Sequence, residues 1–214
     1  MALVIPVIVL AAGRSSRMGQ PKALLPLGAG ETFLTRIART FLDAGVADVV
    51  IVVGHDADAI VKSFAESGLP ARFVLNPNYD RGQLTSLVAG LDVVDRPGTT
   101  ATLVTLVDVP LVSSATVRTV IDRYRATHAP VVRPTSGTRH GHPLLIDRSL
   151  FNALRTADPA AGSKPIVRAH ASSEGDVPIE DEGAFIDVDT AEDYARLISD
   201  RSIDGESTGR RPAP

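Results

Sequence analysis

The chain has 214 residues, of which 44% are hydrophobic and 22% charged, and its formal net charge is −3. This length supports one sizeable α/β domain, and the charge provides no basic field for nucleic acid. The absence of cysteine excludes disulfides, thiolate catalysis and cysteine metal sites. The apolar run from Leu3 to Ala12 is too short to span a membrane and lacks the charged start of a signal peptide. We therefore expect a soluble cytoplasmic protein that contacts no membrane.

The first half of the chain alternates apolar runs with helical patterns. This alternation predicts a three-layer α/β/α fold with a mostly parallel sheet. Strands are expected at Val4–Leu10, Val49–Val53, Arg72–Leu75 and Thr102–Leu106, and helices at Phe33–Ala44, Ala57–Glu66, Leu84–Val94 and Ser113–His128.

The second half is predicted to complete the same domain. Strands of a second layer are expected at Pro130–Arg133 and Pro143–Ile146, and helices at Ser149–Ala157, Gly162–Ala169 and Ala191–Ser199. Residues 200–214 are polar and rich in Gly, Ser, Arg and Pro. We therefore expect a disordered tail after a single domain that covers residues 1–199.

The loop after the first strand is the most informative segment. From Leu10 to Lys22 it reads LAAGRSSRMGQPK. Small residues allow backbone N–H groups to approach a ligand closely, and a polyphosphate requires backbone amides together with cations. A P-loop is excluded, because five residues separate Gly13 from Gly19 and Lys22 follows three positions later. We interpret the loop as a nucleoside triphosphate site.

Two acidic segments point to a metal. Asp108 directly follows an apolar strand, and ligands of open α/β sheets bind at the carboxyl ends of strands. A carboxylate that faces a triphosphate loop there is a natural Mg²⁺ ligand. Asp187 and Asp189 alternate in a segment predicted to be an extended strand, so both would point to one face and repel each other unless a cation neutralises them. Both are candidates for a second metal ligand.

Histidines and a glycine-containing turn provide weaker signals. His140 and His142 share a face in an extended segment, but no third soft ligand has suitable spacing, so we exclude a zinc site. A substrate contact and a structural role are both open for His142. His55 follows the second strand and is a candidate for lining the base pocket. The turn at 162–164 offers backbone amides for an acceptor phosphate.

Several of these motifs together resemble the molybdenum cofactor nucleotidyltransferases, and the cytidylyltransferases in particular. They are L-A-A-G, R-M-G-x-P-K, V-D-V-P, G-H-P and D-V-D-T, and the resemblance spans residues 4–199. It implies a glycosyltransferase-A-like fold and transfer of a nucleoside monophosphate from a triphosphate to a phosphorylated acceptor, molybdopterin cofactor, with Mg²⁺ and release of pyrophosphate. Ala12 stands where relatives that use GTP carry glycine, which favours CTP. Gln83 and Val109 depart from the residues of many relatives.

The resemblance also implies a role for individual residues. Lys22 would hold the α-phosphate, Arg14 and Arg17 the β- and γ-phosphates, and Asp108 and Asp189 the Mg²⁺ ion. The implied nucleotide and acceptor contacts are Leu10, Ala11, Ala12, Gly13, Gly54, His55, Gly82, Gln83, Ser86 and His142.

Other functions remain open at this point. The acceptor could instead be a sugar or polyol phosphate. The fold could have been recruited as an NAD(P)H-dependent oxidoreductase, although hydride transfer does not need Asp108 and Asp189. A third alternative is a nucleotide-sensing or chaperone module that delivers a cofactor, and transient contact with a molybdoenzyme or its chaperone is compatible with the family.

Overall fold

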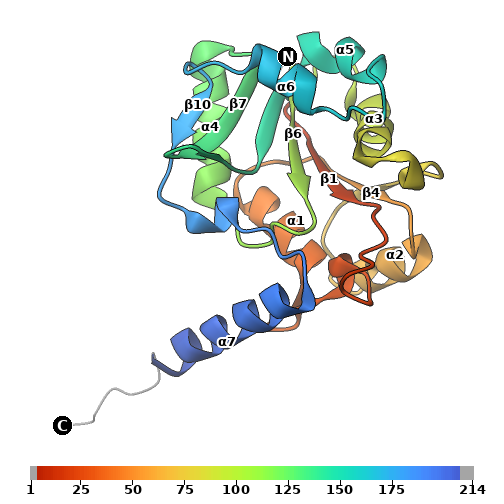
Figure 1. Ribbon diagram of the computed structural model, residues 1–214, viewed down its shortest axis with the longest axis vertical. Helices are drawn as coiled ribbons and strands as arrows, with labels where there is room; N and C mark the ends of the chain where they lie inside the picture. The colour runs from red at the N-terminus through yellow and green to blue at the C-terminus, as the bar shows by residue number, and fades with distance from the viewer. Residues whose placement is uncertain (1–3, 208–214) are drawn as a thin grey trace.

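A central sheet organises the protein. The computed structural model describes residues 4–207, and their side chains as far as residue 199. Within this range the main sheet has eight strands in the order β10-β7-β9-β6-β1-β4-β5, with β8 paired to β7 (Figure 1). The strands are β1 (Val7–Ala11), β4 (Val49–Val53), β5 (Arg72–Leu75), β6 (Ala101–Leu106), β7 (Val131–Ser136), β8 (Arg139–His140), β9 (Leu144–Asp147) and β10 (Asp176–Pro178).

The sheet is mostly parallel, as expected. β1 pairs in parallel with β4 and β6, and β5 in parallel with β4. β9 is antiparallel to both β6 and β7, whereas β10 is parallel to β7. The prediction that Pro130–Arg133 and Pro143–Ile146 form a second layer is therefore wrong. Leu145 and Ile146 point to opposite faces and are both buried, so this strand has to lie in a sheet that is covered on both sides.

Helices cover both faces of the sheet (Figure 1). They are α1 (Phe33–Asp43), α2 (Ala57–Ala65), α3 (Gln83–Val94), α4 (Ser114–Thr127), α5 (Phe151–Arg155), α6 (Lys164–His170) and α7 (Ala191–Ser207). Short helical turns at Lys22–Leu24, Tyr79–Arg81, Arg148–Leu150 and Glu182–Phe185, and a small hairpin of β2 (Pro26–Gly28) and β3 (Glu31–Thr32), complete the fold.

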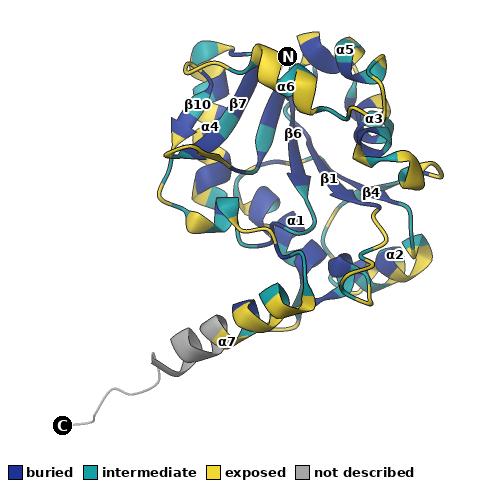
Figure 2. Ribbon diagram, viewed as in Figure 1, coloured by how far each residue is buried: buried dark blue, intermediate teal, exposed yellow. Residues whose placement is uncertain are grey.

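Alternating side chains of the central strands separate two hydrophobic cores. Val7 and Val9 of β1 pack in one core with residues of α1, α2 and α4, whereas Ile8 and Leu10 pack in the other with residues of α3 and α5. All five residues of β1 and of β4 are buried (Figure 2). The three-layer α/β/α architecture predicted from the alternating patterns is confirmed.

Side-chain caps fix the starts of α4 and α7. The Ser113 hydroxyl accepts a hydrogen bond from the Thr116 N–H at 3.2 Å at the start of α4. Thr190 accepts from the Asp193 N–H at 3.1 Å, and Asp193 accepts from the Thr190 N–H at 2.9 Å, which forms a capping box before α7. α7 continues to Ser207, beyond the expected end at Ser199. The rest of the expected tail, 208–214, lies outside the described residues.

The carboxyl ends of β1, β4 and β6 converge at one edge of the sheet. The Val107 N–H donates to the Leu10 carbonyl at 3.1 Å, and the His55 N–H donates to the Ala12 carbonyl at 3.1 Å. The loops after all three strands are thereby fixed beside one another. Across the described residues, no helix has the length and apolar character needed to cross a membrane.

Candidate functional site

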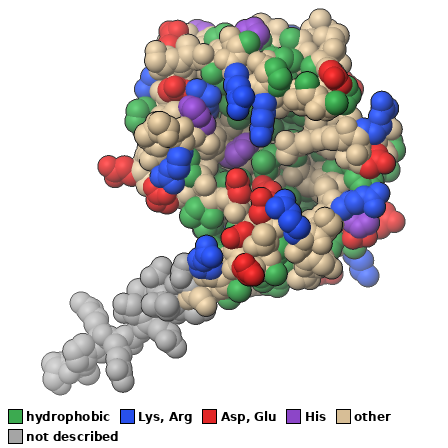
Figure 3. Space-filling view, viewed as in Figure 1, with side chains coloured by type: hydrophobic (Ala, Val, Ile, Leu, Met, Phe, Trp, Pro, Cys, Tyr) green, Lys and Arg blue, Asp and Glu red, His purple; other side chains and the backbone are tan. Residues whose placement is uncertain are grey.

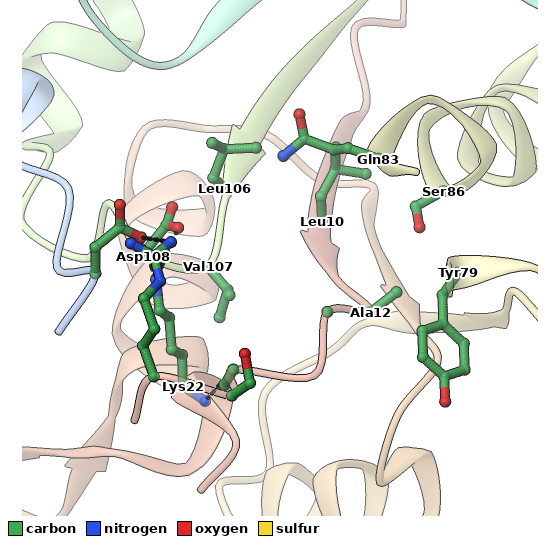
Figure 4. Close-up of a pocket in the computed structure, with 14 residues that line it drawn as sticks. Leu10, Ala12, Lys22, Tyr79, Gln83, Ser86, Leu106, Val107 and Asp108 are labelled. Carbon is green, nitrogen blue, oxygen red and sulfur yellow. Dashed lines mark hydrogen bonds and ion pairs between the residues drawn. The ribbon is translucent and has the colours of Figure 1, made fainter. Parts of the chain in front are cut away.

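A cavity of about 280 Å³ opens where these loops meet (Figure 4). Its walls come from the loop after β1, the first turns of α3, the turn after β6 and the segment before α7. It is lined by Leu10, Ala12, Gly13, Ser15, Ser16, Arg17, Lys22, Tyr79, Gln83, Ser86, Leu106, Val107, Asp108 and Asp189. Nine of the residues proposed from sequence are therefore brought together here: Leu10, Ala12, Gly13, Arg17, Lys22, Gln83, Ser86, Asp108 and Asp189.

The loop after β1 is held open by its own hydrogen bonds. Ser15 has a φ of 49°, and its carbonyl accepts from the Met18 N–H at 2.8 Å. The Ser15 hydroxyl accepts from the Lys22 N–H at 3.1 Å, which fixes the backbone of Lys22. No atom lies within 4 Å of the position that a Cβ would take at Gly13. The space beside this backbone is thus free for an anionic group.

Lys22 lies between two carboxylates. Its Nζ donates to Asp108 Oδ2 at 3.1 Å and to Asp189 Oδ1 at 2.7 Å (Figure 4). The Lys22 side chain is only 9% exposed, whereas that of Asp189 is 43% exposed. Arg17 lies farther from the same group, with 3.7 Å between its Nη2 and Asp189 Oδ1. In this structure the single positive charge of Lys22 therefore offsets part of the negative charge of the two acids.

The segment that carries Asp187 and Asp189 is irregular rather than a strand, which corrects the sequence prediction. The Val188 N–H donates to the Asp108 carbonyl at 2.8 Å, and the Val188 side chain is buried. The Thr190 cap then starts α7 directly after Asp189. This docking, and not strand pairing, places the second acidic segment beside Asp108.

Three titratable groups around the site have displaced pKa values. The hydrogen bond from Lys22 keeps the pKa of Asp189 below its ordinary value. Burial of the carboxyl group, followed by the charge of Asp108, raises the pKa of Asp187. Burial lowers the pKa of His142, whose Nδ1 lies 3.4 Å from the Val104 carbonyl. His142 is therefore neutral at pH 7 and is suited to hydrogen bonding rather than to charge pairing.

The two acids fit a hard divalent cation. Asp108 Oδ1 is buried and has no hydrogen-bond partner, so this oxygen is available to coordinate a cation. Mg²⁺ and Mn²⁺ prefer oxygen ligands, and Mg²⁺ is commonly held by one or two carboxylates together with substrate phosphates. Within the described residues, no three His, Asp or Glu side chains are grouped as metal ligands. Asp108 and Asp189 thus offer two carboxylates to a cation, and the remaining ligands would have to come from a bound molecule or water.

The opposite wall carries neutral polar groups. The buried Asn76 amide donates to the hydroxyls of Thr85 and Ser86, each at 2.9 Å. Because the Ser86 oxygen accepts that bond, its proton is free to point into the cavity. Gln83 and Ser86 project from the first turns of α3, with the Gln83 amide directed toward the Leu106 side (Figure 4). This wall is suited to recognising the edge of a base.

Tyr79 lines the cavity and was not proposed from sequence. Its ring packs directly on Gly54, where a Cβ would come within 2.6 Å of a ring carbon. The guanidinium of Arg14 lies 5.7 Å from the centre of the same ring, and the Tyr79 hydroxyl lies 3.5 Å from His55 Nδ1. An aromatic residue just before the Gly82 turn is the signal that could have indicated it.

Other residues proposed from sequence lie outside the wall of this cavity. Arg14 is exposed over Tyr79, and Gly54 and His55 lie behind that ring. Ala11 is buried in the core on the far face of the sheet. Gly82 has a φ of 117° and forms the turn before α3, so its role is backbone conformation.

A second cavity, of about 460 Å³, adjoins the first. The two share Leu10, Gln83, Leu106, Asp108 and Asp189. His142 lines the second cavity, as do Asp187, the apolar side chains Leu87, Leu144 and Ile146, and the basic side chains Arg133, Lys164 and Arg168. In Figure 3, Lys and Arg side chains lie above a histidine at the centre of this face, and Asp and Glu side chains lie below it.

A loop of small and basic residues and two acids lie at the carboxyl edge of a three-layer α/β/α fold, and this combination is that of a nucleotidyltransferase. Residues 7–174 match the family described as the MobA-like NTP transferase domain. This match covers most of the chain, which therefore belongs to that family. The resemblance to molybdenum cofactor nucleotidyltransferases and the glycosyltransferase-A-like fold are confirmed.

Two curated relatives match nearly the whole chain. Nicotine blue oxidoreductase of Paenarthrobacter nicotinovorans is 35% identical over 205 residues, which are 89% of this chain and 95% of the relative. Molybdenum cofactor cytidylyltransferase of Escherichia coli K12 is 26% identical over 188 residues, which are 87% of this chain and 92% of the relative. The relatives thus include both a transferase and an oxidoreductase.

Among solved structures, Rv0371c of Mycobacterium tuberculosis H37Rv superposes with a TM-score of 0.77 at 32% identity, covering 93% of this chain and 99% of the other. A complex of Rv0371c with manganese has a TM-score of 0.75 at 28% identity, covering 93% of this chain and 100% of the other. Binding of a divalent metal is therefore documented within the fold family.

Proposed function

We propose that this protein transfers CMP from CTP to a phosphorylated acceptor, molybdopterin cofactor, with Mg²⁺ bound and with release of pyrophosphate. The observation that carries the proposal is the pair Asp108 and Asp189, which lines both cavities and has Lys22 between its carboxylates. One cavity contains the phosphate-binding loop and the other has a basic rim. The reacting phosphorus would lie between them, beside these three side chains.

The chain's own residues position the two substrates. Backbone amides at Ala12 and Gly13 and the Arg17 guanidinium bind the triphosphate, and Lys22 balances the charge that develops on the α-phosphate. Asp108 and Asp189 would hold the metal ion, which neutralises phosphate charge when bound. An acceptor phosphate oxygen attacks the α-phosphorus in line, and the bond to pyrophosphate breaks with its electron pair leaving on pyrophosphate. The acceptor is already ionised, so no general base is required.

The second cavity supports a phosphorylated acceptor with an apolar body. Arg133 is neutralised by Asp176, with 2.7 Å between Nε and Oδ1. Lys164 and Arg168, by contrast, have no acidic partner at ion-pair distance among the described residues, and they lie one turn apart on α6. They are available for an acceptor anion, while Leu144 and its apolar neighbours contact the rest of the molecule.

Pyrophosphate release tests this proposal. The purified protein is incubated with Mg²⁺ and each of CTP, GTP, UTP and ATP, with and without molybdopterin cofactor. We expect release with CTP that depends on this acceptor. Release with a sugar or polyol phosphate instead would keep the chemistry but change the acceptor.

A second candidate is an oxidoreductase on the same fold. The relative with 35% identity over nearly the whole chain is nicotine blue oxidoreductase, which is the observation in its favour. Retention of Asp108 and Asp189 favours the transferase, because hydride transfer does not need them. Oxidation of NADPH or NADH in the presence of nicotine blue, without pyrophosphate release from any nucleotide, would establish this candidate instead.

The same proposal extends to the setting of the protein. Residues 1–199 would act as a single domain in the cytoplasm without nucleic acid, and the product would pass to a molybdoenzyme or its chaperone by transient contact. Co-purification of a nucleotide-modified cofactor with such a partner would support this extension.

A further inference from the structure

The position of Lys22 bears on how metal and nucleotide enter. Its Nζ contacts Asp108 Oδ2 and Asp189 Oδ1 at the same time, at 3.1 and 2.7 Å. A metal ion held by these two carboxylates would replace this ammonium group as their counter-ion. If Lys22 stayed in place, two cations would lie beside the same acids in a partly buried site and would repel each other. Lys22 in this position and a metal ion held by both carboxylates therefore disfavour each other.

The Lys22 side chain has a route out of this position. Its backbone is fixed by the bond from its N–H to the Ser15 hydroxyl and by the helical turn that it begins. Lys22 and Gly13 both line the first cavity, so we expect rotation about the Lys22 side-chain bonds to carry the ammonium group into this cavity.

Replacement of Lys22 by a metal ion beside the two acids costs free energy when no triphosphate is bound. Lys22 is nearly buried and its acid partners are partly buried, so separating them leaves uncompensated charges, which is destabilising. A metal ion alone would displace Lys22 into a cavity that holds no anion. A triphosphate alone would draw Lys22 away and leave Asp108 and Asp189 to repel each other. The metal ion supplies the positive charge that Asp108 and Asp189 lose, and the triphosphate supplies the negative charge that Lys22 loses. Binding of the two ligands is therefore coupled, and the coupling is reciprocal.

We infer that Lys22 is an internal counter-ion that occupies the metal position in the nucleotide-free protein and exchanges for the metal when a nucleotide binds. The inference rests on the proposed function only in taking a nucleoside triphosphate as the anion that receives Lys22. Its consequence is a pair of opposite effects. Loss of the Lys22 charge tightens metal binding to the free protein while it weakens nucleotide binding.

Mn²⁺ binding to the nucleotide-free protein tests this inference. Free Mn²⁺ is followed by its electron paramagnetic resonance signal in titrations of the wild type, of Lys22→Met and of Lys62→Met. Lys62 is exposed on α2, so its variant matches the loss of charge away from the site. The metal can bind the wild type only when Lys22 has moved away from Asp108 and Asp189. If this state is populated at about one part in ten or less, Lys22→Met binds Mn²⁺ about tenfold or more tightly than the wild type. Lys62→Met is expected to match the wild type.

A second readout covers the case in which Lys22→Met folds poorly. Thermal unfolding with and without Mn²⁺ is compared for Lys22→Met, Lys22→Gln and the wild type, and the rise in Tm is expected to be larger in both variants. Equal or weaker Mn²⁺ binding in both variants would overturn the inference. Neither readout uses turnover, so a failure of the exchange is distinguishable from a failure to release pyrophosphate.

Discussion

At the scale of single residues, Lys22 links the two halves of the site. Its nearly buried ammonium group reaches acids from the turn after β6 and from the segment before α7. Sequence reasoning identified all three residues, because each lies in a recognisable motif. It did not predict their mutual contact, since Lys22 and Asp189 are 167 positions apart and the irregular segment that carries Asp189 has no periodic pattern.

Replacing Lys22 by Ala is expected to lower kcat for pyrophosphate release by about 10²–10³-fold, because one preorganised donor at the developing charge is lost. The measurement is steady-state turnover with saturating CTP and acceptor. Lys62→Ala is the control and is expected to retain wild-type kcat. An increase in KM with unchanged kcat would assign Lys22 to ground-state binding only.

Gly54 supports the site through Tyr79 rather than by touching a ligand. In Gly54→Ala the new Cβ would meet the Tyr79 ring at 2.6 Å, so the ring has to move out of the cavity wall. We expect a stability loss of about 1–3 kcal/mol from overpacking and a weaker affinity for CTP, measured by urea unfolding and by titration. Wild-type affinity in a folded Gly54→Ala protein would show that Tyr79 does not shape the nucleotide site.

At the scale of elements, one carboxylate joins the start of α4 to the turn before the second acidic segment. Asp181 accepts hydrogen bonds from the Thr116 hydroxyl at 2.6 Å, the Ser113 N–H at 2.9 Å and the Gly183 N–H at 3.0 Å. Burial raises the pKa of Asp181, but these hydrogen bonds lower it by more, so that it lies below its ordinary value. The ionised form is therefore the one that stabilises the fold.

Asp181→Asn is expected to lower the free energy of unfolding by about 1.5–3 kcal/mol at pH 7, since hydrogen bonds to a charged group are lost. Because the pKa of Asp181 is lower in the folded protein, its carboxylate stabilises the fold fully above the unfolded-state pKa of about 3.9. This stabilisation is lost as the pH falls through the lower pKa of the folded state. Urea unfolding between pH 7 and pH 3 should show the wild type approaching the variant at acid pH. Asp122→Asn, at an exposed position on α4, should show no such convergence.

Local chemistry explains which elements could be predicted. The runs Val49–Val53 and Arg72–Leu75 are strands with those bounds, and the Thr190–Asp193 pair starts α7 as its side chains indicate. The place of β9 could not be predicted, because an apolar run of four residues fits an edge, a centre or a second sheet equally well. Its central place depends on antiparallel pairing with β7, which is close in the chain, and with β6, which precedes α4.

At the scale of the whole molecule, two adjoining cavities share a pair of acids at one edge of the sheet. The sequence motifs indicated the first cavity and its acids. The second cavity includes His142 of the G-H-P motif and Ser163 and Lys164 of the 162–164 turn, but its shape follows from the tertiary arrangement of β7, β9, α6 and the segment before α7. Under the proposed function, two phosphorylated ligands would meet at Asp108 and Asp189.

Ligand binding is expected to stabilise the entire fold. CTP with Mg²⁺ at about 100 times its Kd should raise the free energy of unfolding by about 2.7 kcal/mol, measured by urea unfolding. An Asp108→Asn variant should lose most of this increment, because the metal and the nucleotide then bind poorly together. An equal increment in the variant would argue against a metal-dependent nucleotide site.

Pyrophosphate release from CTP and Mg²⁺, measured in the presence and absence of molybdopterin cofactor, distinguishes a transferase from an oxidoreductase. We predict release that requires both CTP and this acceptor and that is lost in Asp108→Asn. Absence of release with every nucleotide and acceptor, from a folded protein that oxidises NADPH with nicotine blue, would contradict the transferase and establish the oxidoreductase.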